Sequence, residues 1–258
     1  MIGYIDSHAH IPICKESEDQ IVHEAIENHF LHIMNVGYDP VSSTDSLKLA
    51  KKYSWIDAAF GIHPHYIGLH ESTLSVFLQN QLQHSEYKAV GEIGMDTVKS
   101  KTDLSLQRKC FSEQIAFALE HHYPIIVHNR EADQEVYDVI QQFSGIQGVM
   151  HCYSSDRKMA EKFLKLGFYL SFSGNITYKR SIELREVVKM VPENKLLLET
   201  DCPYLTPIPY RGKVLNKPFF VMEVYKEAAF LRDVQIEELS KQIICNYRTL
   251  FHGGMYEC

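Results

Sequence analysis

The alternation of short apolar runs with longer amphipathic segments constrains the fold of this chain most strongly. Eight apolar runs indicate buried strands, and the segments between them show helical periodicity. The expected strands are Ile2–Asp6, His32–Val36, Ile56–Gly61, Ala89–Gly94, Ile125–His128, Gly148–His151, Phe168–Phe172 and Leu196–Thr200. Eight strand–helix units of about 30 residues predict an α/β fold, the (β/α)8 TIM barrel, whose usual length is about 250 residues. A doubly wound α/β sheet shows the same alternation, so the pattern alone leaves it open.

Three segments show the helical period most clearly, and the C-terminal part indicates two closing helices. The three segments are Leu104–His121, Arg157–Leu166 and Ile182–Met190. The closing helices are expected within Phe219–Phe251, with a break near Asp233 or Gln235. No sequence repeat, low-complexity tract or linker interrupts the chain, so we expect a single domain over residues 1–258.

The bulk composition restricts the class of protein. Hydrophobic residues make up 45% and charged residues 23% of the chain, as in ordinary globular proteins. No apolar run reaches the ~18–20 residues of a membrane helix, and the N-terminus lacks a signal-peptide pattern. The six cysteines form no C-x-x-C pair, so we expect reduced thiols in a cytoplasmic protein. The net charge of −7 argues against non-specific coating of duplex phosphates.

Ionisable side chains gather at the carboxyl ends of the expected strands. His8 and His10 close the first strand and point to one side of it, because strand side chains alternate. The later strands contribute Glu92, His128, His151 and Asp201. In a barrel these strand ends share the face that carries the active site. Nitrogen and oxygen ligands without thiolate suit Zn²⁺, Mn²⁺ or Mg²⁺, and six ligands predict two ions with one bridging carboxylate.

Each of these positions also has a purely structural interpretation. A strand-end histidine can serve only as a hydrogen-bonding residue, Glu92 as an ion-pair partner, and Asp201 as the cap of the next element. We favour the metal site because the structural interpretation would have to be correct at every one of these positions to exclude it. Cys152 and Cys202 stand beside proposed ligands, but alternation along a strand directs them into the core.

A series of ordered motifs runs along essentially the whole chain. It comprises Asp6-Ser7-His8-Ala9-His10, Gly61-Ile62-His63-Pro64-His65, Gly91-Glu92-Ile93-Gly94-Met95-Asp96, Val127-His128-Asn129-Arg130, His151-Cys152-Tyr153-Ser154, Gly167-Phe168-Tyr169-Leu170-Ser171-Phe172-Ser173-Gly174, Leu198-Glu199-Thr200-Asp201-Cys202-Pro203-Tyr204-Leu205 and Pro209-Tyr210-Arg211-Gly212-Lys213, with Asn216, Asn246 and Phe251. With these motifs the chain resembles the TatD family of metal-dependent hydrolases, in the amidohydrolase-like barrel superfamily. The resemblance implies that His8, His10 and Asp201 hold one metal ion. It implies that His128 and His151 hold a second ion, with Glu92 bridging the two.

Two departures from the family pattern are visible. Thr97-Val98 stands after Asp96, where the family usually has an aromatic pair, and Asn129 replaces a usual serine. Neither coincides with a proposed ligand. Both bear on substrate contacts, and the sequence leaves their effect open.

The activity implied by the resemblance is metal-dependent phosphodiester hydrolysis, notably 3′→5′ exonuclease action on DNA and sometimes RNA. Two cations roughly 3.5–4 Å apart suit this chemistry, because they clamp a phosphate and activate a water. The expected catalytic residues are Glu92, as the bridge, and Asp201, as a carboxylate base for the water's proton. His63, Arg130 and Arg211 are expected to bind the substrate. Pro64 stiffens the loop of His63, and guanidinium groups offer bidentate donors to phosphate, with a structural ion pair as the alternative.

The expected partners are DNA or RNA ends, with no membrane partner. In a chain this acidic, metal ions would supply the positive charge that holds the phosphate. One rival interpretation is an ester or amide hydrolase, such as a D-aminoacyl-tRNA deacylase, in which the same metals polarise a carbonyl. A second is a non-catalytic binding protein, which we disfavour because all six ligand types are present. The native substrate, the physiological metal and the oligomeric state, a monomer included, stay open.

Overall fold

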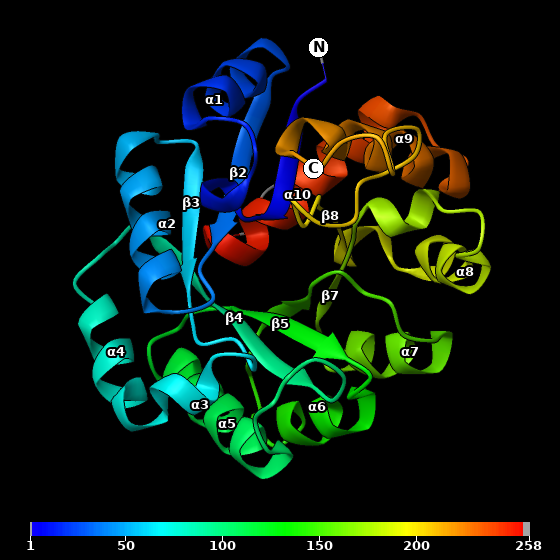
Figure 1. Ribbon diagram of the computed structural model, residues 1–258. Helices are drawn as coiled ribbons and strands as arrows, with labels where there is room; N and C mark the ends of the chain where they lie inside the picture. The colour runs from blue at the N-terminus through cyan, green and yellow to red at the C-terminus, as the bar shows by residue number, and fades with distance from the viewer. Residues whose placement is uncertain (1, 255–258) are drawn as a thin grey trace.

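The computed structural model describes residues 2–254, and over that range eight parallel strands form one sheet in the order β1 to β8 (Figure 1). The strands are β1 (Tyr4–Ala9), β2 (Phe30–Val36), β3 (Ile56–Phe60), β4 (Tyr87–Asp96), β5 (Ile125–Arg130), β6 (Gly148–Met150), β7 (Tyr169–Phe172) and β8 (Leu196–Leu198). Each strand pairs with the next one in the sequence, and an isolated parallel bridge between Ala9 and Cys202 joins the last to the first. The predicted TIM barrel is confirmed, and the doubly wound alternative is excluded.

Helices alternate with the strands and lie outside them in Figure 1. They are α1 (Glu18–Glu27), α2 (Pro40–Lys52), α3 (Ile67–His70), α4 (Leu74–Gln81), α5 (Leu104–Glu120), α6 (Asp133–Ile140), α7 (Arg157–Lys165), α8 (Ile182–Met190), α9 (Val221–Arg232) and α10 (Ile236–Phe251). Short 3₁₀ turns are η1 (Ile11–Ile13), η2 (Glu71–Thr73), η3 (Gly174–Thr177), η4 (Glu193–Lys195) and η5 (Pro218–Phe220). Side chains of Ser17, Asp39 and Asp156 accept first-turn backbone N–H groups, which explains where α1, α2 and α7 begin.

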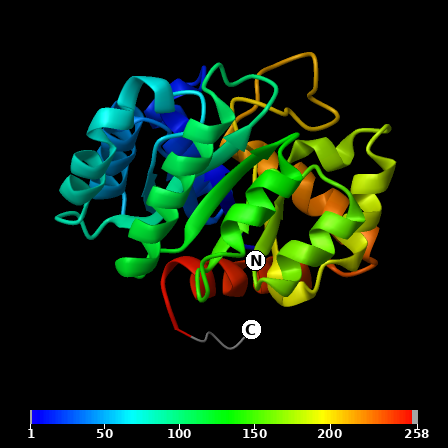
Figure 2. The same ribbon diagram turned by 90° about the horizontal axis from the view of Figure 1, so that it is seen from below.

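The two closing helices were predicted correctly. Asp233 ends α9 in the left-handed conformation with φ 54°, and Gln235 is the residue before α10. Figure 2 shows α10, in red, along the edge of the molecule below the strands. The Asn246 amide donates to the carbonyl of Leu196 at 2.7 Å, which fastens α10 to the start of β8. α10 therefore covers the amino end of the barrel, α9 packs outside it beside α8, and the carboxyl end stays free for a site.

Strand boundaries differ from the prediction where the site lies. β1 extends to Ala9 and so contains His8, while β4 runs on to Asp96. β8 ends at Leu198, two residues before the predicted end at Thr200. Asp201 consequently stands in a turn with φ 54° and not on a strand. Its backbone N–H donates to the carbonyl of His8 at 2.9 Å, so the turn is tied to the first strand.

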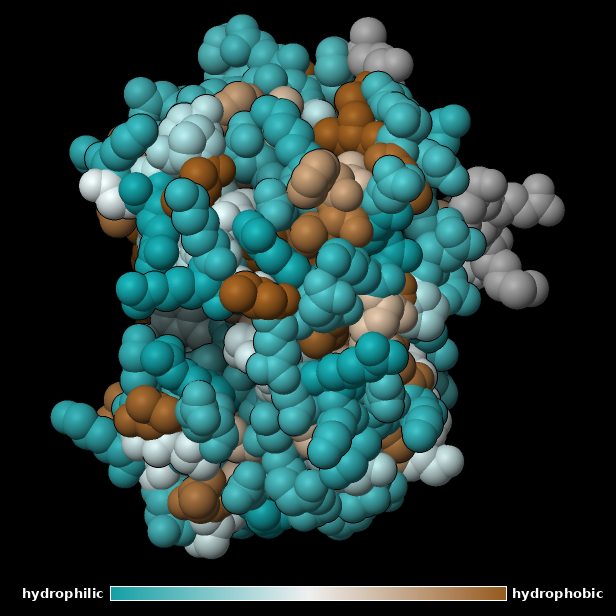
Figure 3. Space-filling view, turned by 90° about the vertical axis from the view of Figure 1, so that its right-hand side faces the viewer, coloured by the Kyte–Doolittle hydropathy of each residue, from teal (hydrophilic) through white to brown (hydrophobic). Residues whose placement is uncertain are grey.

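The expectation of reduced thiols is confirmed in part. Cys14, Cys110, Cys152 and Cys202 are free, whereas Cys245 is disulfide-bonded and corrects the expectation, and Cys258 lies outside the described residues. Within residues 2–254, no helix combines the length and the apolar composition needed to cross a bilayer. Figure 3 shows a mostly hydrophilic face on which hydrophobic side chains form scattered groups.

Candidate metal centre

The carboxyl end of the barrel brings His8 and His10 to one oxygen of Glu92 and Asp201 to the same two imidazoles. Glu92 Oε2 lies 3.6 Å from His8 Nε2 and 3.7 Å from His10 Nε2. Asp201 Oδ1 lies 3.8 Å and 3.7 Å from the same two nitrogens. The two imidazole nitrogens are themselves 3.2 Å apart. Strand alternation therefore places both histidines of the first strand where the sequence predicted them.

The other oxygen of Glu92 faces a second set of histidines. Glu92 Oε1 lies 2.9 Å from His128 Nδ1 and 2.9 Å from His151 Nε2. His63 Nε2 lies 3.4 Å from the same oxygen, and its ring centroid is 4.3 Å from that of His128. His63 is buried, and with Glu92 and His128 it forms a group able to hold a metal ion. Its predicted contact with substrate stays a prediction, because this position also suits a ligand.

Gly94 allows β4 and β5 to approach closely enough for Glu92 and His128 to meet. Gly94 pairs with His128 in the sheet and has φ +146°, a conformation that residues with a side chain rarely adopt. A Cβ atom at this position would lie 1.9 Å from the carbonyl oxygen of His128. Any other residue here would push the two strands apart and separate the carboxylate from its imidazole.

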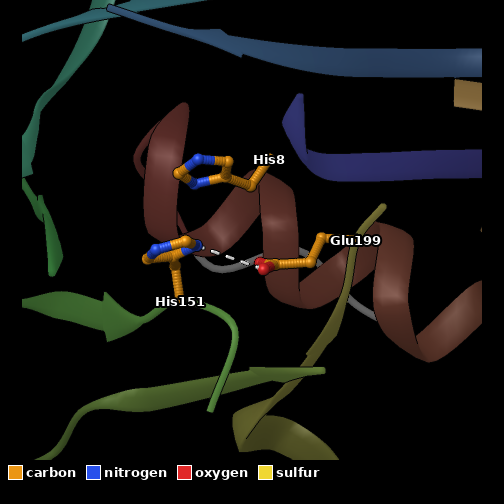
Figure 4. Close-up of side chains that lie close together, drawn as sticks. All are labelled: His8, His151 and Glu199. Atoms are coloured by element: carbon orange, nitrogen blue, oxygen red, sulfur yellow. Dashed lines mark hydrogen bonds and ion pairs between the residues drawn. The ribbon is translucent and has the colours of Figure 1, made fainter. Parts of the chain in front are cut away.

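Glu199 orients His151, a role that the sequence interpretation missed. Glu199 Oε1 lies 3.2 Å from His151 Nδ1 and accepts the backbone N–H of Cys152 at 2.8 Å (Figure 4). The ring of His8 stacks on that of His151 with centroids 4.0 Å apart. The available signal was spacing, because Glu199 precedes Asp201 by two residues, as His8 precedes His10.

Asp96 is a second missed residue and holds the far side of His128. Asp96 Oδ2 lies 3.3 Å from His128 Nε2 and 2.7 Å from His65 Nε2. Its Oδ1 accepts the backbone N–H groups of Val98 and Lys99 at 2.8 Å and 2.7 Å. The ring of His128 is thus fixed between two carboxylates. His65, from the loop that follows β3, also joins this network.

The two predicted arginines lie outside the buried cluster. Arg130 ends β5 and is exposed. Arg211 is also exposed, and its guanidinium lies 3.8 Å from the ring centroid of Tyr178. The stack gives Arg211 a defined position in the loop that follows β8, at the same end of the barrel as the cluster.

The family departures lie beside the cluster. The Thr97 hydroxyl donates to the carbonyl of Glu131 at 2.7 Å, and the Asn129 amide donates to Asp133 at 2.5 Å. The Val98 side chain is exposed, while its N–H holds Asp96. These contacts secure the turn after β4 and the start of α6.

Burial and mutual contact shift the acidities of the cluster. Burial raises the pKa of Asp201 to about 6, and it lowers the pKa of His10 to about 4 and that of His63 to about 3. Burial alone would raise the pKa of Glu92, but the imidazoles of His151 and His63 hold it well below its usual value. A charged carboxylate surrounded by nitrogen donors is suited to a cation.

The donor set fits divalent metal ions. It consists of imidazole nitrogens and carboxylate oxygens that lie close enough to share an ion, as in the groups His8–His10–Glu92 and His63–Glu92–His128. Among the described residues, His8 Nδ1 is buried without a hydrogen-bond partner, so the hydrogen bonds present do not satisfy the cluster completely.

One pocket adjoins the cluster at His10, and a separate groove lies between the loop after β8 and the start of α1. A pocket of about 230 Å³ is lined by His10 and Tyr38 among others. A wider groove of about 710 Å³ is lined by Lys15, Lys213, Val214 and Leu215 among others. Aromatic rings surround His10, with centroid distances of 5.5 Å to Tyr38 and 6.4 Å to Tyr204. The cluster is therefore accessible from one side.

Comparison with known proteins agrees with this geometry. A family model described as TatD related DNase matches residues 5–252. The uncharacterized metal-dependent hydrolase YabD of Bacillus subtilis is 35% identical over 251 residues, which cover 95% of this chain and 98% of that protein. The uncharacterized metal-dependent hydrolase TatD of Mycobacterium tuberculosis is 30% identical over 260 residues, covering 97% and 98%. The crystal structure of YjjV, a TatD homologue from Escherichia coli K12, has a TM-score of 0.91 at 27% identity and covers 96% of this chain and 98% of that chain. The chain therefore belongs to the TatD family and is a metal-dependent hydrolase.

Proposed function

We propose that this chain is a metal-dependent 3′→5′ exonuclease that hydrolyses phosphodiester bonds at the ends of DNA or RNA. The observation that supports the proposal most strongly is that the two carboxylate oxygens of Glu92 face two different sets of imidazoles. Its Oε2 faces His8 and His10, and its Oε1 faces His128 and His151. This arrangement supports a two-cation site bridged by one carboxylate, which is the type of site that phosphate ester hydrolysis uses.

We infer which side chains would hold each ion from the contacts around Glu92. His8, His10 and Asp201 would hold the first, His128 and His151 would hold the second, and Glu92 would serve both. Two divalent cations, Mg²⁺, Mn²⁺ or Zn²⁺, supply Lewis-acid activation of water and neutralise the charge of the phosphate when bound. Glu199 and Asp96 keep the second pair of imidazoles in place through the bonds described above.

Asp201 is the proposed general base. Its side chain is half-buried at 14% exposed, and a pKa of about 6, raised by loss of solvent, keeps it ionised at neutral pH while leaving it more basic than an ordinary aspartate. The turn that carries Asp201 is held by the N–H bond to His8. The oxygen that would take the proton of water is thus fixed within 4 Å of both first-strand imidazoles, at 3.8 Å and 3.7 Å.

The mouth of the barrel supports recognition of a strand end. Tyr38, Tyr66 and Tyr204 present aromatic surface near His10, and Tyr38 stacks on Tyr66 at 5.3 Å. Nucleobases of single strands stack on such rings without sequence preference. Arg211 lies on the same side and offers donors to phosphate. Because the cluster itself is buried, an end reaches it more easily than the interior of a duplex.

A substrate panel tests the proposal. Full-length protein loaded with Mg²⁺, Mn²⁺ or Zn²⁺ is incubated with 5′-labelled single-stranded DNA, the matching RNA, circular single-stranded DNA, a D-aminoacyl-tRNA and an aryl ester. We expect the linear strands to shorten stepwise from the 3′ end and the circle to stay intact. Cleavage of the circle at a comparable rate would contradict exonuclease action. Release of a D-amino acid with the nucleic acid intact would support the deacylase instead.

A further inference from the structure

A second histidine–carboxylate cluster lies at the opposite end of the barrel. Asp57 Oδ2 lies 3.1 Å from His32 Nδ1, 2.9 Å from His252 Nε2 and 2.7 Å from the Tyr247 hydroxyl. His32 and Asp57 stand near the starts of β2 and β3, whereas Tyr247 belongs to α10 and His252 follows it. The residues that would hold metal for hydrolysis lie at the strand ends, so the two clusters are separate.

We propose that His32, Asp57 and His252 form a Zn²⁺ site that fastens the end of α10 to the amino end of the barrel. Their three ligand atoms lie within 4.8 Å of one another. Ligands about 2.0–2.1 Å from a tetrahedral zinc ion are about 3.3 Å apart. The distances of 3.1 Å and 2.9 Å from Asp57 to the two imidazoles are within a few tenths of an ångström of that value.

The number of donors on Asp57 Oδ2 favours a metal over a set of hydrogen bonds. One carboxylate oxygen offers about two lone-pair directions, yet two imidazole nitrogens and a hydroxyl converge on it. With Zn²⁺ bound, the neutral imidazoles direct lone pairs to the ion and only the Tyr247 hydroxyl still donates to the carboxylate. A hydrogen-bonded carboxylate is the usual support of a metal ligand.

The donor set and its accessibility select zinc. Two imidazoles and one carboxylate suit Zn²⁺, whereas Mg²⁺ and Ca²⁺ prefer oxygen ligands. The Asp57 side chain is 5% exposed, but His32 and His252 are 14% and 24% exposed, which gives the ion a path from solvent. The ring of His32 stacks on that of Tyr247 with centroids 5.4 Å apart, so His32 is already oriented.

Binding of Zn²⁺ at this site would stabilise the folded chain. The ligands come from β2, β3 and the segment after α10, so one ion cross-links parts of the chain that only the folded state brings together. An ion that binds the folded state alone raises the melting temperature Tm with its concentration. Unlike the cluster at the mouth, this site takes no part in hydrolysis.

The test compares the wild-type chain with His252→Ala and with His23→Ala as a matched control. His23 is another histidine with a single carboxylate partner, Glu27, and its side chain is 73% exposed. Each protein is stripped with chelator, saturated with Zn²⁺, passed through a desalting column and analysed for metal by mass spectrometry. We expect His252→Ala to hold one zinc ion fewer per chain than the wild type and the control. Its kcat/KM should equal that of the wild type.

Two further measurements decide the question. At a zinc concentration about 100 times its Kd, the site should raise Tm by roughly 5–10 °C more in the wild type than in His252→Ala. Equal zinc content and equal Tm shifts in the wild type and His252→Ala would mean that these residues only form hydrogen bonds, and would overturn the proposal. Wild-type crystals soaked in Zn²⁺ need no variant: an anomalous peak between His32, Asp57 and His252 supports the site, and its absence at a concentration that fills the mouth contradicts it.

Discussion

The carboxyl and amino ends of the barrel each carry a cluster of histidines around one carboxylate, but the two clusters differ in their surroundings. At the carboxyl end, Glu92 is shared between two sets of imidazoles beside a pocket of about 230 Å³. At the amino end, Asp57 meets two imidazoles and a tyrosine hydroxyl from the segment that closes the barrel. The ligands at the mouth adjoin this pocket, whereas the residues at the amino end lie where the last helix docks on the strands. The comparison teaches that access to a pocket, and the number of imidazoles around the carboxylate, distinguish a site suited to hydrolysis from one suited to cross-linking the chain.

The largest expected effect is the loss of hydrolysis in Glu92→Gln. Removing the charge leaves both sets of imidazoles without their shared carboxylate. Breaking a buried charged network in this way costs about 3–5 kcal/mol of interaction free energy. We expect kcat/KM to fall by about 10²- to 10⁴-fold, together with loss of metal at the mouth. Kinetics and metal analysis on one oligonucleotide check this. Turnover near the wild-type value would show that hydrolysis does not need the shared carboxylate, and the proposed difference between the two ends of the barrel would be wrong.

Asp57→Ala should have the converse effect. It removes the partner of two imidazoles and of Tyr247, and we expect a loss of roughly 3 kcal/mol in the free energy of unfolding. Hydrolysis should stay within about twofold of wild type, because the cluster lies at the other end of the barrel. Urea unfolding and kcat/KM measured on the same preparation give the two values. A tenfold fall in kcat/KM with unchanged stability would mean that the two ends are coupled.

The pH dependence of the unfolding free energy of the metal-free protein gives a further test of the cluster at the carboxyl end. His63 has a folded-state pKa of about 3, lowered by burial, against 6.5 in the unfolded chain. The unfolded state therefore binds a proton that the folded state refuses, and the stability from this group is present above pH 6.5 and is lost as the pH falls toward 3. Between pH 7 and pH 5 this amounts to about 2 kcal/mol of unfolding free energy.

The check is urea unfolding of chelated wild type and His63→Gln at both pH values. The variant lacks the titrating ring, so its loss of stability between pH 7 and pH 5 should be smaller by about 2 kcal/mol. Equal losses in the two proteins would place the proton uptake elsewhere in the mouth. Metal content of His63→Gln, measured at pH 7, shows in addition whether this ring is a ligand or contacts the substrate.

The smallest expected effect is that of Arg211→Lys. Lysine keeps the charge but loses the planar stack on Tyr178 and the bidentate geometry toward phosphate. We expect kcat/KM to fall by about tenfold, near 1.4 kcal/mol, with metal content and stability unchanged. An unchanged kcat/KM would return Arg211 to a structural role and confine the substrate contacts to the residues nearer the pocket.

The sequence predicted the strands and the gathering of six ionisable residues at one end of the barrel, because both follow from local patterns. Alternation along a strand predicted His8 and His10, and it also puts Asp96, four residues after Glu92, on the same side of β4. Glu199 stands two residues before Asp201, but both follow the end of β8, so alternation gave no comparable signal there. Strand boundaries were less accurate, since β8 ends early and Asp201 depends on a turn. The contact between Asp57 and His252 had no local signal, because 195 residues separate the two and only the docking of α10 brings them together.

The bridge between Ala9 and Cys202 has a consequence for the making of the protein. A chain that leaves the ribosome presents His8 and His10 at once, but Asp201 emerges only after β8. The ligand set proposed for the first ion is therefore complete only when the segment after β8 has met the first strand. A prematurely terminated product keeps His8, His10 and Glu92 but lacks Asp201, so an unfinished chain lacks the proposed general base.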